Sequence, residues 1–423
     1  MGDVVVGARQ ARAIPTLPVL GWATFAGERA APLPSVLDAR YRRYTISGRA
    51  AIAHALRLLE VAPGDKVLVP TYHCPTMIAP VVQATAQPMF YPVTASGAPD
   101  LQWLNAADLT GVRVMLAAHY FGLPQPMGQV RGFCVGRRIA LIEDCAHAFF
   151  GMSEGRPVGG WGDVAIASLT KFFPVPEGGL IVSDTLPLDR LHMEPRGWYG
   201  QVKAAADAFE LGIRYGRFHG LNGVFGPLFG LKDRLRQPER PVENGQLPSP
   251  PGLPAASRLL SLSHPALAAR WISKLAHQAR IVALRRRNYE RLAERLDGLT
   301  GSRPLRPMLP PASAPYVFPL HVDDPTASYQ RLRGSGIPIF CWDEVWPETP
   351  RLAGDYGLDW STRVYQLGCH QDLSLDEVDA IADRVCEVLG SAPASAASAT
   401  RELRRSSGEI ARIGSSVGAD YRG

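Results

Sequence analysis

Short apolar runs alternate with stretches of helical spacing along the first half of the chain. The runs have the composition of buried strands and lie at residues 66–70, 87–93, 112–118, 139–142 and 164–167. Helical spacing is found at residues 51–59 and 78–84. Strands that alternate with helices predict an α/β fold with a mostly parallel sheet between helices. In such a sheet, ligands bind at the carboxyl ends of the strands.

The second half of the chain alternates in a similar way. Large apolar side chains recur at helical spacing over residues 267–296, which predicts one long helix. Strands are predicted at 316–322 and 337–342, and a helix at 375–389 whose start carries Ser374 and Glu377 at capping-box spacing. Residues 1–40 and 391–423 lack such periodicity. We expect a leader segment at one end and a disordered tail at the other.

The composition is ordinary for a soluble globular enzyme. The 423 residues suffice for two domains, with 46% hydrophobic and 20% charged residues. Six scattered cysteines, without metal-type spacing or a preceding signal peptide, favour free thiols in the cytoplasm. The net charge of +6 is modest, so we interpret the basic residues as solvated surface and predict no nucleic-acid binding. No apolar run is long enough for a membrane span.

Two of the predicted strands end beside side chains of opposite charge. The run at 139–142 is followed by Glu143 and Asp144, and the run at 164–167 by Ser168, with Lys171 three residues further on. Since such strand ends meet at one edge of a sheet, we expect the carboxylate and the amine to lie close together. This pair suits pyridoxal 5'-phosphate (PLP), whose aldehyde needs a lysine and whose ring nitrogen needs an acidic partner.

The residues around this pair resemble the DegT-type sugar aminotransferases, a branch of the fold-type I PLP-dependent enzymes. The resemblance is carried by Glu-Asp-Cys-Ala-His-Ala at 143–148, the Gly-Asp turn at 162–163, Ser168 with Lys171, and Glu-Gly-Gly at 177–179. It extends from about residue 47 to residue 389, with a poorly matching interval at about 195–254. It implies a large PLP-binding domain at 41–255 that contains this insert. Residues 256–390 would form the long helix and a smaller C-terminal α/β domain.

The resemblance also implies roles for the strand-end residues. Lys171 would form the Schiff base with PLP and then move a proton as base and acid, while Asp144 would pair with the ring nitrogen and Ser168 with the phosphate. His147 stands where most members carry Gln, and a ring nitrogen could still hydrogen-bond the phenolic oxygen of PLP. The spacing from serine to lysine is three residues, against the commoner five. Lysine, in place of the histidine of related sugar dehydratases, favours amino-group transfer.

Further cofactor contacts are expected from two turns earlier in the chain. A Ser-Gly turn that opens a helix offers free backbone N–H groups to an anion, so Ser47, Gly48 and Arg49 are expected at the phosphate. An aromatic residue of the family lies flat on the PLP ring. Alignment at Thr76 places His73 at that position, with Tyr72 as the alternative.

Other candidates would border the substrate or a second subunit. His119 follows a strand, Trp342 and His370 lie near predicted strand ends, and Arg258 matches a family position that reaches the neighbouring active site. A homodimer is therefore implied. Residues 216–236, with aromatic side chains beside basic ones, are expected to be a flap or subunit contact; docking on a membrane surface is the weaker alternative.

The resulting hypothesis is an aminotransferase that moves an amino group from an amino acid, glutamate by preference, to a keto sugar, most simply a nucleotide-linked keto-deoxy sugar. It would act in polysaccharide or secondary-metabolite biosynthesis. A dehydratase or epimerase that uses PLP, or a regulatory protein that binds PLP without turnover, are the alternatives. No residue pattern identifies the acceptor, the stereochemistry of amination or the pathway.

Overall fold

The computed structural model describes residues 14–27, 33–235, 263–311, 313–325 and 327–390. Several expectations therefore lie outside the described residues: the first part of the leader, the later part of the insert, the domain boundary at 255, Arg258, and the tail at 391–423.

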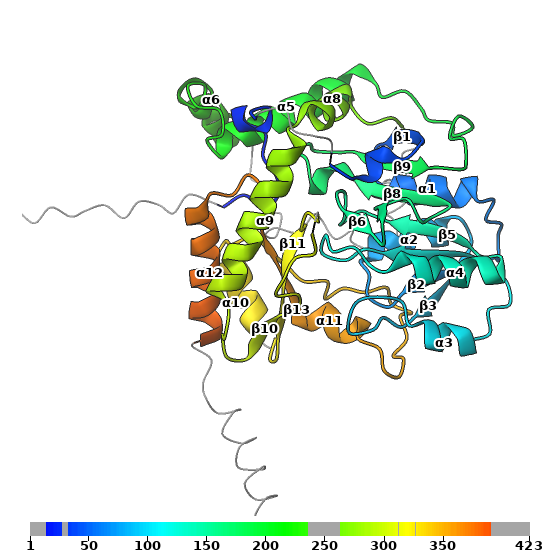
Figure 1. The fold of residues 1–423 in the computed structure, drawn as a ribbon. Helices are drawn as coiled ribbons and strands as arrows, with labels where there is room; N and C mark the ends of the chain where they lie inside the picture. The colour runs from blue at the N-terminus through cyan, green and yellow to red at the C-terminus, as the bar shows by residue number, and fades with distance from the viewer. Residues whose placement is uncertain (1–13, 28–32, 236–262, 312, 326, 391–423) are drawn as a thin grey trace, which may run out of the picture.

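A seven-stranded sheet forms the centre of the larger part (Figure 1), in the order β1-β9-β8-β5-β4-β2-β3. The strands are β1 (Tyr41–Thr45), β2 (Lys66–Pro70), β3 (Gln87–Tyr91), β4 (Val112–Ala118), β5 (Ala140–Asp144), β8 (Val164–Ser168) and β9 (Gly179–Ser183). The five strands from β8 to β3 are parallel, and β9 runs antiparallel to both β8 and β1. The predicted α/β fold with a mostly parallel sheet is confirmed.

Helices flank this sheet and connect its strands. They are α1 (Gly48–Leu58), α2 (Pro75–Gln83), α3 (Leu101–Ala106) and α4 (Met127–Arg137), and a short hairpin of β6 (Met152–Ser153) and β7 (Arg156–Pro157) precedes β8. Leu68, Leu116 and Ile166 on the central strands are buried. Strands covered on both faces read as near-continuous apolar runs, which is why the sequence pattern located them.

A second, antiparallel sheet with its own apolar core lies beside the first (Figure 1), in the order β10-β11-β13-β12. Its strands are β10 (Ser302–Pro304), β11 (Val317–Val322), β12 (Ile339–Phe340) and β13 (Val364–Gly368), accompanied by α10 (Ser328–Gly334), α11 (Gly357–Arg363) and α12 (Leu375–Gly390). The capping box is present: Ser374 N donates to Glu377, and Glu377 N donates to Ser374 Oγ at 3.2 Å.

The single long helix predicted at 267–296 is wrong, because two helices occupy this range. They are α8 (Leu267–Leu275) and α9 (Gln278–Arg295). His277 between them is extended, and its Nδ1 accepts a hydrogen bond from Arg280 N, which caps the start of α9. The backbone N–H of His277 donates to Thr24 O in the N-terminal segment. A contact with a distant segment therefore breaks a helix that local periodicity would continue.

The described part of the insert, residues 195–235, contains two helices at one end of the molecule (Figure 1). These are α5 (Trp198–Arg214), which packs against α8, and α6 (Asn222–Leu235), which lies within the segment expected to be a flap. Within the described residues, no helix has the length and apolar character needed to span a membrane.

Candidate active site

Asp144 and Lys171 lie at the carboxyl edge of the large sheet. Asp144 is the last residue of β5, and Lys171 ends a short 3-10 helix that directly follows β8. The two strands pair in register, Asp144 opposite Ile166, so the edge of the sheet holds both side chains. This is the arrangement expected from strand ends in a parallel sheet.

The two groups influence each other electrostatically. Burial raises the pKa of Asp144, while the Ala146 N–H, at 2.8 Å from its Oδ1, and the charges of Lys171 and His119 oppose this rise. Burial lowers the pKa of Lys171, with Cys74 and Asp144 acting in the opposite direction. Among the described residues, no carboxylate forms an ion pair with Lys171; its Nζ instead lies 5.3 Å from the centre of the Tyr316 ring. A lysine amine with a lowered pKa is available as a nucleophile and as a base.

Aromatic rings form a wall beside Lys171. The His147 ring lies 4.5 Å from Tyr316 and 5.1 Å from Trp342, and Trp342 lies 4.8 Å from Tyr72, measured between ring centres. His147 Nδ1 accepts from Phe121 N at 3.4 Å, which leaves Nε2 as the nitrogen that carries hydrogen in the neutral ring. Burial and the charge of Lys171 lower the pKa of His147 well below its usual value.

A turn suited to an anion lies beside the end of β8. Ser47 caps α1 by accepting from Ala50 N at 3.2 Å, and a Cβ on Gly48 would stand 3.6 Å from the Ser168 Cβ. A Cβ on Gly179 would lie only 2.3 Å from the carbonyl carbon of Ser47, so a glycine is needed for this close approach. Thus two segments that are distant in sequence bring Ser47, Gly48 and Ser168 to one helix N-terminus.

Arg49 and Cys74 belong to the same neighbourhood. Arg49 is the second residue of α1, and burial lowers its pKa against the influence of Cys74. Cys74 precedes α2, contacts Thr76 Oγ1 at 2.8 Å, and also acts on the pKa of Lys171. Sequence reasoning missed Cys74, although it directly follows the two ring candidates.

His73 and Tyr72 occupy different environments. His73 is fully buried; its Nδ1–H donates to Pro70 O at 2.9 Å, its Nε2 accepts from Trp346 N at 3.0 Å, and its ring lies 5.4 Å from Phe90. Both ring nitrogens are thus committed to the backbone. Tyr72 instead belongs to the aromatic wall that ends at Lys171.

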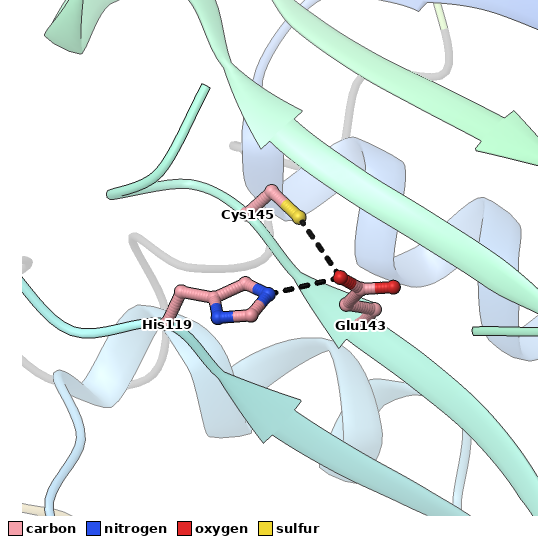
Figure 2. Close-up of side chains that lie close together, drawn as sticks. All are labelled: His119, Glu143 and Cys145. Carbon is pink, nitrogen blue, oxygen red and sulfur yellow. Dashed lines mark hydrogen bonds and ion pairs between the residues drawn. The ribbon is translucent and has the colours of Figure 1, made fainter. Parts of the chain in front are cut away.

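His119 belongs to a buried cluster with Glu143 and Cys145 (Figure 2). His119 Nε2 donates to Glu143 Oε1 at 2.9 Å, and its Nδ1 accepts from Gln125 N at 2.8 Å. Glu143 also accepts from the backbone N–H groups of residues 159, 161 and 162, and Cys145 Sγ lies 3.9 Å from Oε1. Although these donor types could ligate a metal, their lone pairs and hydrogens already have protein partners. The cluster fixes the 159–162 loop to β5.

Sequence reasoning missed a buried arginine that donates a hydrogen bond to the backbone of Lys171. Arg285 on α9 is 0% exposed; its Nη2 donates to Lys171 O at 2.6 Å, and its Nε donates to Gln371 Oε1 at 2.7 Å. Gln371 Nε2 in turn donates to Phe172 O at 2.9 Å. In the sequence Arg285 looks like one of three adjacent surface arginines, and only the packing of α9 separates it from them.

The remaining substrate candidates do not gather at one point. Trp342 belongs to the aromatic wall. His370 is buried, its Nε2–H donates to Pro15 O at 2.9 Å, and burial lowers its pKa to about 3. It anchors the N-terminal segment, and no described contact links it to Lys171.

The sequence of this site matches a known family. Residues 33–193 match the model of the DegT/DnrJ/EryC1/StrS aminotransferase family. A UDP-N-acetyl-3-dehydro-alpha-D-glucosamine 3-aminotransferase of Acidithiobacillus ferrooxidans is 31% identical over 157 residues, 34% of this chain and 40% of the relative. A dTDP-4-dehydro-2,6-dideoxy-D-glucose 3-dehydratase of Saccharopolyspora spinosa is 30% identical over 144 residues, 32% of this chain and 30% of the relative. The match spans about two fifths of the length of the first curated relatives.

Solved structures share the fold over a longer range. A putative sugar aminotransferase of Streptococcus pneumoniae, solved in its PLP form, superposes with a TM-score of 0.60 at 16% identity, covering 89% of this chain and 99% of that one. The fold likeness therefore includes the second sheet, where the sequence match has ended. Residues 33–193, which supply Asp144, Lys171 and the Ser-Gly turn, carry the sequence of the DegT/DnrJ/EryC1/StrS aminotransferase family.

Proposed function

We propose that this protein is a PLP-dependent aminotransferase that moves an amino group from glutamate to the keto group of a nucleotide-linked keto-deoxy sugar. The observation that carries the proposal is the Lys171 amine with its lowered pKa, next to the buried Asp144 carboxylate and the Ser47–Gly48 helix start. A sugar acceptor in polysaccharide or secondary-metabolite biosynthesis is supported by the names of the relatives, which include enzymes of nucleotide-sugar amination.

The residues present fit PLP. The N-terminus of α1, with Ser47, Gly48 and Arg49, offers backbone N–H groups and a cation to the phosphate, and Ser168 adds a hydroxyl. Asp144 offers a carboxylate to the ring nitrogen. In the aromatic wall, His147 would offer its Nε2–H to an oxygen of the cofactor, and Tyr72 supplies apolar surface. When bound, PLP withdraws electrons from the carbon that carries the amino group, which makes its hydrogen acidic.

Lys171 would attach the cofactor and transfer protons. Because burial lowers its pKa, a larger fraction of the amine is neutral near pH 7 than for a solvent-exposed lysine. A neutral amine can act as a base that accepts the proton from the substrate carbon. The resulting ammonium can then act as an acid and donate the proton again. Arg285 donates a hydrogen bond to the Lys171 carbonyl, which fixes the backbone that carries the amine.

A PLP-dependent dehydratase or epimerase is the alternative within enzymes. The dehydratase among the relatives motivates it. An aminotransferase must consume donor nitrogen in proportion to product, whereas a dehydratase need not. A keto-sugar product that contains no donor nitrogen would therefore select the dehydratase. A PLP-binding regulatory protein would show no conversion with any amino donor.

We further propose a homodimer that acts in the cytoplasm. Six apolar side chains on α5 and α8 are each more than half exposed, which is unusual unless a second surface covers them: Trp198, Tyr199, Val202, Leu267, Trp271 and Leu275. The six cysteines are free in the described structure, consistent with a reducing compartment. Sedimentation of an active monomer would contradict the dimer.

Visible absorbance of the purified protein tests the central proposal. We expect a band from PLP bound to wild type, its conversion on addition of glutamate, and its loss in Lys171→Ala. Lys203→Ala, a substitution of an exposed lysine on α5, is the matched control and should keep the band. A wild-type protein that shows no band after incubation with PLP would refute the proposal.

A further inference from the structure

The segment at residues 177–179 joins the two halves of the candidate active site through its backbone. Its central residue, Gly178, donates from its N–H to Ile46 O at 2.8 Å, and its carbonyl accepts from Leu169 N at 3.0 Å. Ile46 directly precedes the Ser-Gly turn, and Leu169 begins the 3-10 helix that ends at Lys171. The 177–179 segment therefore fixes how the turn and the lysine lie relative to each other.

The two glycines of this segment allow a close approach of backbones. Gly178 has a φ of +129°, a conformation that favours glycine, and Gly179 pairs with Thr45 of β1 on one side and with Ser168 of β8 on the other. Since glycines have no side chain, they give the segment no side-chain anchor. The adjacent residue, Glu177, supplies one.

The Glu177 carboxylate is bound on both oxygens by groups from a later part of the chain. Arg196 Nη2 donates to Oε2 at 2.6 Å, and Ala266 N donates to Oε1 at 2.7 Å. The side chains of Glu177 and Arg196 are 16% and 25% exposed, so salt and water screen this ion pair less than a surface pair. Ala266 is the N-cap of α8, and the positive end of the helix dipole favours the carboxylate.

These two partners belong to helices that are joined to each other. Arg196 lies just before α5, which packs against α8. Gln201 Oε1 on α5 accepts from Leu267 N at 2.7 Å, and Glu194 O accepts from His264 N at 2.9 Å. The starts of α5 and α8 thus form one frame, and the Glu177 carboxylate attaches the 177–179 segment to it.

We propose that Glu177 is a positioning residue for the cofactor. By fixing the 177–179 segment to α5 and α8, it holds the Ser-Gly turn and Lys171 in place before the cofactor binds, which lowers the cost of ordering them. Glu177 acts through the backbone and does not touch the reacting atoms. Its role in cofactor binding rests on the proposed function, whereas the anchoring of the segment rests on these contacts alone.

Titration of PLP, followed by its absorbance, tests the role in cofactor binding. Glu177→Gln keeps the size of the side chain and removes its charge, and we expect the dissociation constant for PLP to rise at least fivefold. Arg196→Gln breaks the same ion pair from the other partner. It should shift the dissociation constant in the same direction but less, because the hydrogen bond from Ala266 N remains.

Glu377→Gln is the matched control. Like Glu177, Glu377 pairs with one arginine, Arg217 at 2.8 Å, and accepts from one backbone N–H, that of Ser374 at 2.8 Å; its side chain is 22% exposed. Among the described residues, no contact links Glu377 to the 177–179 segment. Its substitution should leave the dissociation constant for PLP within twofold of wild type.

Hydrogen exchange of the proteins without PLP measures the anchoring by itself. The amides of Leu169 and Gly178 should exchange at least fivefold faster in Glu177→Gln than in wild type, because the segment opens locally more often. In Glu377→Gln they should exchange at the wild-type rate. Arg196→Gln carries both measurements if Glu177→Gln does not fold.

Unchanged exchange of these two amides in Glu177→Gln would overturn the anchoring and the proposal with it. Faster exchange with a PLP affinity within twofold of wild type would overturn the positioning role, because the carboxylate would then stabilise only the fold. A wild type that never binds PLP rejects the aminotransferase, and the exchange rates then still decide whether Glu177 anchors the segment.

Discussion

Replacement of Arg285 by Met should destabilise the protein strongly. The guanidinium is fully buried and, besides its bonds to Lys171 and Gln371, donates from Nη1 to Pro315 O at 3.0 Å and to Tyr316 O at 3.2 Å. Burial lowers its pKa to about 10, so it remains charged at neutral pH. The cation also lies 4.5 Å from the centre of the Phe172 ring.

The expected magnitude follows from the hydrogen-bond acceptors that the substitution leaves without a donor. Three backbone carbonyls and one side-chain carbonyl would lose their donor, and each unpaired buried acceptor costs about 1–3 kcal/mol. These losses overlap, because the carbonyls can shift together and Met fills part of the volume. We therefore expect a decrease of about 3–5 kcal/mol in the free energy of unfolding, as found for broken buried polar networks.

Urea unfolding monitored by tryptophan fluorescence measures this loss. Arg384→Met is the control, since it removes a partly exposed arginine whose ion pair with Glu387 is worth about 0–1 kcal/mol. Arg285→Lys keeps the charge but supplies a single donor group, so it should fall between wild type and Arg285→Met. A loss below about 1 kcal/mol in Arg285→Met would refute the argument that these four acceptors depend on Arg285.

The Arg285 network also predicts a change at the active site. With the Lys171 carbonyl released, the Lys171 amine would sample more orientations, so PLP should bind more weakly to Arg285→Lys even at temperatures where the variant is fully folded. Titration of PLP, followed by its absorbance, measures this. If Arg285 only stabilised the fold, the affinity for PLP would be the same in Arg285→Lys as in wild type.

Two further predictions concern burial and backbone conformation. Because burial lowers the pKa of His73 to about 4, the unfolded state binds a proton below about pH 6.5 that the native state does not take up until about pH 4. The free energy of unfolding should therefore fall by on the order of 3 kcal/mol as the pH drops across this interval. In urea unfolding measured at several pH values, His73→Gln should show a shallower decline of this free energy with falling pH. A decline as steep as that of wild type would contradict the prediction. Gly122→Ala should cost more than Gly64→Ala, although both glycines have a left-handed φ, +88° and +86°. A Cβ at Gly122 would meet Tyr316 N at 2.3 Å, whereas Gly64 has no atom within 4 Å, so only Gly64→Ala should be limited to about 1–2 kcal/mol of backbone strain. Equal unfolding midpoints for the two variants would reject this contrast.

Local sequence patterns predicted the structural elements that depend only on residues close together in the chain. The strands at 66–70 and 112–118 were predicted with the bounds that the structure has, because a strand buried on both faces must be a short continuous apolar run. The capping box at Ser374 and the order of acidic and basic residues after β5 and β8 are equally local. Since parallel strands end at one edge, the meeting of Asp144 and Lys171 followed from topology alone.

Contacts between distant segments decided the rest. The break between α8 and α9 depends on Thr24, the environment of His73 on Trp346, and the burial of Arg285 on carbonyls from three other segments. Periodicity reports which face of an element is apolar, but not which partner covers it, and side-chain roles depend on that partner.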